Sequence, residues 1–213
     1  MTDGNHRRHH LHRCDECCPD RAIAGVPRRR VLAGVAAGTA ALAGCSSGSD
    51  GGGGGDRPDP VTLTTDDQCE VCGMVIPNHP GPSTEIFYAD HTPTGHPNPA
   101  HFDSTWEAFQ YDFRRGDQGW QRSVMYVTDY SAVDYRIRTD QGDRLISRHP
   151  KASAFVAADD VTFVAGSAVK GAMGKDLIGF GERGDARSFA DEHGGQLVGL
   201  GDVSRELIAQ LGT

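Results

Sequence analysis

The chain has 213 residues, of which 21 are Lys or Arg and 29 are Asp or Glu, so its formal net charge is −8 at pH 7. A negative surface disfavours binding to nucleic acid and attracts cations or basic partners weakly. The only lysines are Lys151, Lys170 and Lys175. An acidic, lysine-poor composition indicates a high-salt organism, where screening by ions weakens the repulsion between the negative charges of the protein.

The first 44 residues have the pattern of an export signal. Arg28, Arg29 and Arg30 precede a short apolar run, residues 31–44, which is below the roughly 20 residues that a membrane-spanning helix needs. The paired arginines predict a twin-arginine signal over residues 1–44. Leu42-Ala43-Gly44-Cys45 fits a lipobox, so Cys45 is the predicted site of lipid attachment. A plain cleaved signal with a chance cysteine is the alternative.

Residues 45–57 include five consecutive glycines and predict a flexible tether between the lipid and the fold. The first folded unit is predicted over residues 58–140. It has a helix starting at Asp103 or Ser104, where Ser104 and Glu107 form a capping box, and Trp106, Phe109 and Phe113 share one buried face. Strands are expected at residues 61–63, 74–76, 84–88, 123–128 and 135–138.

The second unit, predicted over residues 141–213, repeats this order. Strands are expected at residues 161–164 and 176–180, followed by a helix from Asp185 that ends at Gly194-Gly195. A returning strand over residues 196–200 and a terminal helix over residues 204–211 complete it. The predicted fold class is therefore α+β, with two similar ββαβ units packed together.

The motif with chemical content is Cys69-Glu70-Val71-Cys72-Gly73-Met74. Two thiols separated by two residues can converge on one ion, and Gly73 lets the backbone fold tightly enough for Met74 to join them. Thiolate and thioether ligands together select Cu(I), whereas zinc rarely uses methionine. The remaining cysteines lie at or before Cys45, so this motif has the only two thiols of the folded part.

Other ligands are less specific. Met173 lies just before a strand of the second unit and is either a further copper ligand or a core residue, whereas Met125, inside an apolar strand, is expected in the core. Among the histidines, His101 is the best candidate for an extra metal ligand because it lies beside the helix start.

Three alternatives to a copper site are open. A thiol–disulfide oxidoreductase using Cys69 and Cys72 is the alternative function, although Gly73 to Pro77 cannot continue as the helix that a thioredoxin-like pair requires. Structural zinc would add His96 and His101, at an unusually long spacing. An inert disulfide would close a strained loop. No arrangement typical of a catalytic site is present, so we expect a binding protein and not an enzyme.

These residues resemble the NosL family of nitrous oxide reductase accessory lipoproteins. The resemblance covers residues 61–203, and its most specific parts are the Cys72-Gly73-Met74 and Met173-Gly174 pieces. One departure is Val133 to Ile137, which only partly matches the family's Trp-Ile-Asp-Ala piece. Further matching pieces are His79-Pro80-Gly81-Pro82, Phe102-Asp103-Ser104, Tyr126-Val127-Thr128-Asp129-Tyr130, Phe163-Val164-x-Gly-Ser167, Asp176-Leu177 and Phe189-Ala190-x-x-x-Gly194-Gly195.

The resemblance implies two ββαβ units and a chaperone that delivers Cu(I) to the copper–sulfide centre of nitrous oxide reductase. It further implies a position outside the cytoplasm, on the outer face of the cytoplasmic membrane and next to an ABC-type membrane transport complex. Transferred to this sequence, Cys72 and Met74 are the first expected ligands, with Met173 and Cys69 next.

Overall fold

The computed structural model describes residues 57–212. The predicted signal, the lipid-attachment residue Cys45 and the tether up to residue 56 lie outside the described residues. The described residues all belong to one compact unit. Within the described part, no helix combines the length and the apolar character that crossing a bilayer requires.

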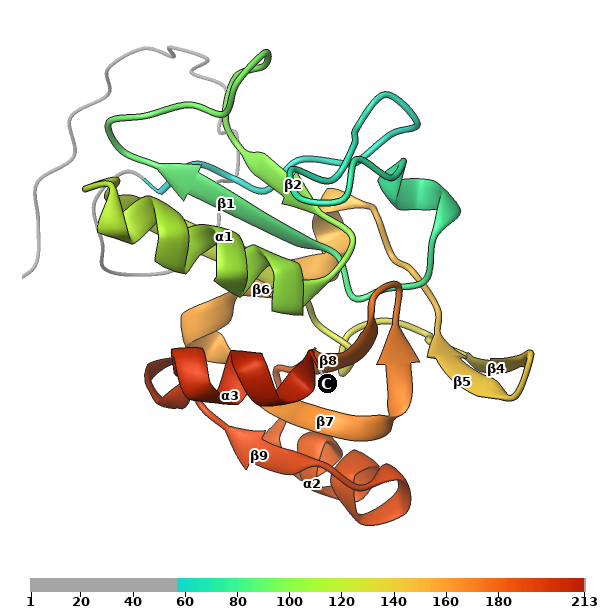
Figure 1. Cartoon of the computed structure of the whole chain (residues 1–213). Coiled ribbons are helices and arrows are strands. Elements are labelled where there is room, and N and C mark those ends of the chain that lie inside the picture. Colours follow the sequence, from blue (N-terminus) through green and yellow to red (C-terminus); the bar gives the residue numbers. More distant parts are fainter. Residues whose placement is uncertain (1–56, 213) are drawn as a thin grey trace, which may run out of the picture. The chain divides into compact units, whose positions relative to one another are not determined.

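The first sheet is antiparallel and has the strand order β2-β1-β3-β6 (Figure 1). Helix α1 (Thr105–Asp117) connects β2 to β3 and packs against β1 and β2. Its apolar side chains recur at three- and four-residue steps, which places them on one face. The strands are β1 (Thr84–Tyr88), β2 (Ala100–Phe102), β3 (Arg122–Thr128) and β6 (Phe155–Ala157).

The second sheet has the strand order β4-β5-β7-β8, with β9 paired to β7. Helix α2 (Arg183–His193) follows β8 and packs on β7, whereas α3 (Arg205–Leu211) packs against α1. The strands are β4 (Ile137–Asp140), β5 (Asp143–Ile146), β7 (Thr162–Gly171), β8 (Gly174–Phe180) and β9 (Gln196–Val198). Short 3-10 helices are η1 (Ile76–Asn78), η2 (Ala152–Ala154), η3 (Ala158–Asp160) and η4 (Leu200–Asp202).

The two sheets contain the same ββαβ connectivity. In β1-β2-α1-β3 and again in β7-β8-α2-β9, the first strand lies in the middle and pairs antiparallel with both other strands. The α+β fold class is confirmed. Helix α2 ends at Gly194 as predicted, with the Gly194 N–H donating to the Ala190 carbonyl at 2.8 Å.

Parts of the predicted first unit are wrong. Residues 61–63 form no strand, and residues 74–76 contribute only an isolated bridge between Gln68 and Val75 before η1 begins. The second strand of this unit is β2, which is three residues long and follows two prolines, so that it has too little periodicity to be recognised. The expected boundary at residue 140 falls in the turn of the β4–β5 hairpin, and β6 beyond it belongs to the first sheet.

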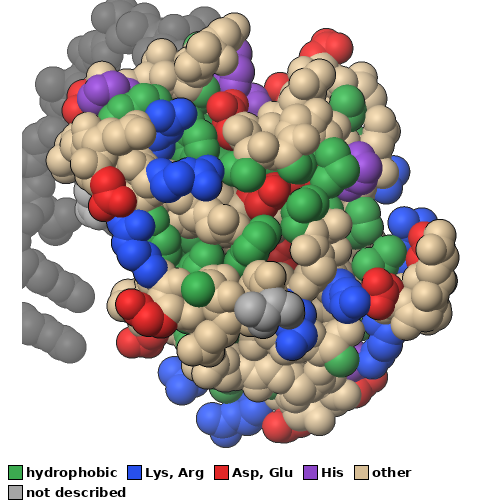
Figure 2. Space-filling view, viewed as in Figure 1, with side chains coloured by type: hydrophobic (Ala, Val, Ile, Leu, Met, Phe, Trp, Pro, Cys, Tyr) green, Lys and Arg blue, Asp and Glu red, His purple; other side chains and the backbone are tan. Residues whose placement is uncertain are grey.

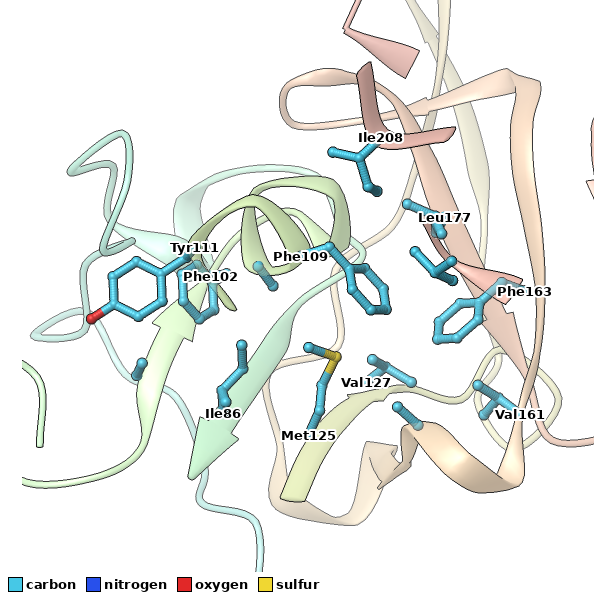
Figure 3. Close-up of a cluster of buried hydrophobic side chains, with 14 of the residues drawn as sticks. Ile86, Phe102, Phe109, Tyr111, Met125, Val127, Val161, Phe163, Leu177 and Ile208 are labelled. Atoms are coloured by element: carbon cyan, nitrogen blue, oxygen red, sulfur yellow. The ribbon is translucent and has the colours of Figure 1, made fainter. Parts of the chain in front are cut away.

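Helix α1 lies between the two sheets and supplies the centre of the main core. Phe109 is 2% exposed and packs edge-on against Phe163 of β7, with ring centroids 5.9 Å apart. Figure 3 shows this ring among side chains from both sheets and from α3. Met125 is part of this core, as predicted. Trp106 is half-buried and donates from Nε1 to the Ile208 carbonyl at 2.7 Å, which fastens α3 to α1.

Alternation along β7 and β8 divides the second sheet between two cores. Phe163 and Leu177 face α1, whereas Val164 and Ile178 face α2. Because successive side chains of a strand point to opposite faces, this alternation follows directly from the strand geometry. The middle of the second sheet, β7 and β8, is therefore covered on both sides, by α1 and by α2.

Glu85, the second residue of β1, is completely buried. Its Oε2 accepts a hydrogen bond from the Val61 N–H at 3.0 Å, whereas Oε1 has no partner. Burial raises the pKa of Glu85 to about 8, against the Val61 hydrogen bond and with help from the charge on Asp67. The carboxyl group is thus protonated in the folded protein at neutral pH.

We expect Glu85→Gln to flatten the pH dependence of stability. With a folded pKa of about 8 and an ordinary value of 4.5, Glu85 gives its full stabilisation below pH 4.5 and loses it as the pH rises towards 8. The free energy of unfolding, measured by urea denaturation, should fall with pH more steeply in the wild type, by up to about 1.4 kcal/mol per pH unit. Glu192→Gln, at an exposed residue of α2, is the control, and equal slopes in the wild type and Glu85→Gln would contradict the assignment.

Candidate metal centre

The two cysteines lie in a tight turn that brings both thiols to one side. The Cys69 N–H donates to the Met74 carbonyl at 2.9 Å, and the Gly73 N–H donates to the Cys69 carbonyl at 2.9 Å. Gly73 has φ +72°, a backbone conformation that residues with a side chain rarely adopt. Cys69 is buried, Cys72 is half-buried, and both are free thiols.

The first turn of α1 brings two carboxyl groups to these thiols. The Cys69 thiol donates to Glu107 Oε2 at 3.0 Å, and Cys72 Sγ lies 3.5 Å from Asp103 Oδ1. One ligand atom from each of the four residues lies within 4.8 Å of the others. Asp103 precedes the N-cap Ser104 and Glu107 lies in the first turn of α1, so one helix start supplies both carboxyl groups. Both are buried, with exposed fractions of 0% and 2%.

The carboxyl groups were not expected from the sequence. Ser104 is the N-cap of α1 and accepts from the Glu107 N–H at 3.3 Å, as the predicted capping box requires. The Glu107 carboxyl, however, turns towards Cys69 instead of returning to the Ser104 backbone. The available signal was the pair of acids at positions 103 and 107, on either side of the N-cap of a helix with a buried face.

The surroundings keep the thiols protonated in the metal-free protein. Burial raises the pKa of Cys69 far above its ordinary value, and the charge on Asp103 and the hydrogen bond to Glu107 add to this. Burial also raises the pKa of Cys72. The backbone N–H groups of Val71 and Cys72 act in the opposite direction at Cys69, because they stabilise a thiolate.

Glu107 shares this environment. Burial raises the pKa of its carboxyl group, and the negative charge of Asp103 raises it further, against hydrogen bonds from the two thiols. Within residues 57–212, neither Asp103 nor Glu107 has a salt bridge with a basic side chain. Four acidic groups thus converge without a compensating cation, which is an arrangement that a metal ion would neutralise.

The methionines named as ligands lie in two different turns. Met74 is half-buried and directly follows Gly73 in the cysteine turn. Met173 is 40% exposed, in the turn between β7 and β8. This exposure excludes the alternative that Met173 is a core residue and leaves its thioether accessible.

His101 lies beside the thiol cluster but outside it. Its ring stacks on His96, with centroids 5.0 Å apart, and its Nδ1 is 3.6 Å from Asp67 Oδ1. Burial lowers the pKa of His101, which the charge on Asp67 opposes. Both histidines line a groove of about 620 Å³ that also reaches Cys69. In the described chain, neither histidine belongs to the group of residues whose ligand atoms converge, so the geometry does not assemble the zinc site considered above.

The geometry also bears on the redox alternative. A reactive dithiol pair needs a lowered thiol pKa, usually at a helix amino terminus. Here the pair lies in a turn, and both thiol pKa values are raised. The environment favours neutral thiols that lose their protons when a metal ion binds.

Asp103→Asn should lower the pKa of both thiols, because the Asp103 charge is one cause of each upward shift. A chain that begins at Ser46 contains the compact unit and has Cys69 and Cys72 as its only thiols. In this chain, the rate of alkylation by iodoacetamide at fixed pH should increase, with its midpoint shifted to lower pH. Asp117→Asn, at the other end of α1, is the control, and an unchanged pH profile in Asp103→Asn would show that the carboxylate does not act on the thiols.

Comparison with known proteins leads to the same family as the sequence motifs. The profile of the NosL family matches residues 60–208. Copper-binding lipoprotein NosL of Stutzerimonas stutzeri is 26% identical over 152 residues, which are 71% of this chain and 70% of that protein. The protein of the same name from Achromobacter cycloclastes is 30% identical over 150 residues, 70% of this chain and 69% of its own length.

A solved structure is similar as well. The crystal structure of the copper chaperone NosL from Shewanella denitrificans aligns with a TM-score of 0.54 and 25% identity, and the alignment covers 70% of this chain and 99% of that one. The cysteine motif, the duplicated ββαβ fold and the match over residues 60–208 lead to one conclusion: this chain is a member of the NosL family.

Proposed function

We propose that this protein is an exported copper chaperone that binds Cu(I) through Cys69, Cys72 and Met74 and transfers it to another protein. The observation that carries the proposal is the convergence of two free thiols and two buried carboxyl groups within 4.8 Å, without a basic partner among the described residues. The names of the relatives, a copper-binding lipoprotein and a copper chaperone, support copper as the metal.

The donor set favours Cu(I) over harder ions. Thiolate and thioether sulfur are soft ligands, and Cu(I) accepts two or three of them. The carboxyl groups have a different use, because both thiols must lose a proton before they bind the ion. Glu107 Oε2 already accepts from the Cys69 thiol, so it is placed to receive that proton. Asp103 stands in the same relation to Cys72.

Transfer requires ligands that a partner can reach. Cys72 is half-buried, and Val71, between the two cysteines, is 37% exposed, so this turn lies at the surface. Met173 presents a further exposed thioether from the second unit, which makes it a candidate for the ligand that completes the site or takes part in exchange. An open turn suits ligand exchange better than a closed cage of four ligands.

The client and the location are proposed from the resemblance and from the relatives' names. The client is nitrous oxide reductase, whose copper–sulfide centre would receive the ion next to an ABC-type membrane transport complex. An acyl chain on Cys45 would anchor the protein on the outer face of the cytoplasmic membrane, with residues 45–57 as the tether. On the face shown in Figure 2, Lys and Arg side chains are interspersed with acidic and apolar ones and form no continuous basic surface.

A Cu(I) titration tests the proposal. The chain from Ser46 onward, titrated under reducing conditions against a chromophoric Cu(I) chelator, should bind one equivalent. Cys72→Ser should abolish this binding, because it removes one of the two thiolates. Met74→Leu should weaken it by about tenfold, equivalent to about 1.4 kcal/mol, because it removes the soft neutral ligand.

Met125→Leu is the matched control for Met74→Leu, since it changes a methionine that is 2% exposed in the core and should leave the affinity unchanged. Preferential one-to-one binding of zinc would contradict the proposal. Thiol–disulfide exchange activity that survives in Met74→Leu, together with Cu(I) affinity equal to that of the wild type, would favour the oxidoreductase alternative.

A further inference from the structure

The amino end of α1 is held by a residue of the second unit. Asp176 lies on β8 and is 1% exposed. Its Oδ1 accepts from the Trp106 N–H at 2.8 Å, and its Oδ2 accepts from the Ser104 hydroxyl at 2.9 Å. The first turn of a helix has backbone N–H groups without partners inside the helix. Asp176 satisfies one of them directly and orients the N-cap side chain that satisfies another.

These contacts lead directly to the thiol cluster. The Ser104 hydroxyl that donates to Asp176 also accepts from the Glu107 N–H at 3.3 Å. Asp103, the carboxyl partner of Cys72, immediately precedes Ser104. Both carboxyl groups of the cluster therefore lie on the segment that Asp176 holds, although Asp176 contacts neither thiol.

The fit around Asp176 is close. A Cβ atom placed on Gly171 would lie 2.5 Å from Asp176 Oδ2 and 2.8 Å from the Gly81 carbonyl oxygen, so only glycine is tolerated there. The Leu177 N–H, at 2.8 Å, gives Oδ1 a second donor. A buried carboxyl group with three donors and no room to move can hold the helix start in one position.

We propose that Asp176 is a positioning residue of the Cu(I) site. By fixing the first turn of α1 it sets Asp103 and Glu107 against the two thiols, so the second unit is part of the site although it contributes neither cysteine. This inference rests on the proposed function, since it assumes that the thiol cluster binds the metal. It also gives the Met173 turn, three residues before Asp176, a fixed connection to the first unit.

The start of α2 provides a matched comparison. There the Gly181 N–H donates to Asp129 Oδ1 at 2.7 Å, and the Ser131 N–H donates to the same oxygen at 2.8 Å. Asp129 follows β3, so a carboxyl group of the first unit holds Gly181, the residue before the α2 N-cap Glu182. Only the α1 start, however, carries residues of the thiol cluster.

The experiment compares Asp176→Asn with Asp129→Asn in the chain from Ser46 onward. An amide nitrogen cannot accept a hydrogen bond, so Asp176→Asn should remove the acceptor of the Ser104 hydroxyl, disorder the α1 start and lower Cu(I) affinity by about tenfold. X-ray absorption at the copper edge should show a changed ligand shell in Asp176→Asn and an unchanged one in Asp129→Asn. Thermal melting of the metal-free variants measures the loss of stability in each.

Equal affinity and equal spectra in Asp176→Asn and the wild type would overturn the inference while leaving the proposed function intact, as would equal losses in the two variants. Failure of the wild type to bind Cu(I) would instead remove the proposed function.

If Asp176→Asn does not fold, Ser104→Ala replaces it and Ser204→Ala, at the N-cap of α3, is its control. Ser104→Ala should weaken Cu(I) binding, Ser104→Thr should restore it, and Ser204→Ala should have no effect. Any other pattern of Cu(I) affinities among these three variants would refute the positioning role.

Discussion

The buried amino end of α1 is the constraint on which the site depends. Asp103, Ser104 and Thr105 are fully buried, so water cannot satisfy the free backbone N–H groups of this turn. Protein oxygens from Ser104 and Asp176 do so instead. The helix dipole makes the same place favourable for negative charge. The polar groups needed to bury a helix end and the carboxyl groups beside the thiols therefore belong to one arrangement.

This arrangement raises the pKa values of several neighbouring groups, which keeps protons on them. Burial raises the pKa of Asp176 to about 7, with the charge on Asp103 as an added cause, and it raises the pKa of both thiols and of Glu107. These groups cannot all be charged together without a cation. In the metal-free protein these groups therefore tend to stay protonated, and a bound cation would replace the protons. Binding of a metal ion at this site would release protons, so its affinity would depend on pH.

The two units of the duplicated fold contribute different residues to the thiol site. Both units have the same ββαβ connectivity, and a carboxyl group of each unit bonds the other unit at the helix start, as Asp176 does in α1, or just before it, as Asp129 does ahead of α2. Where the first unit has Asp103 and Ser104 after its second strand, the second has Gly181 and Glu182. The first unit thus carries the thiols and their acids. The second supplies Asp176 and the exposed Met173 turn, both carried by the largely buried strands β7 and β8.

The sequence alone determined the Cys69–Met74 motif, the order of strands and helices from residue 161 onward, and the core role of Met125, because tight-turn glycines and apolar periodicity are local signals. It did not reveal β2, the pairing of β6 with β3 in the first sheet, or the boundary between units. Short strands have little periodicity, and strand pairing is decided by residues far apart in the sequence. Asp103 and Glu107 looked like parts of a helix cap, and Asp176 like one residue of a strand. Only the tertiary structure, which buries the start of α1 between a cysteine turn and β8, decided that these three carboxyl groups meet at one place.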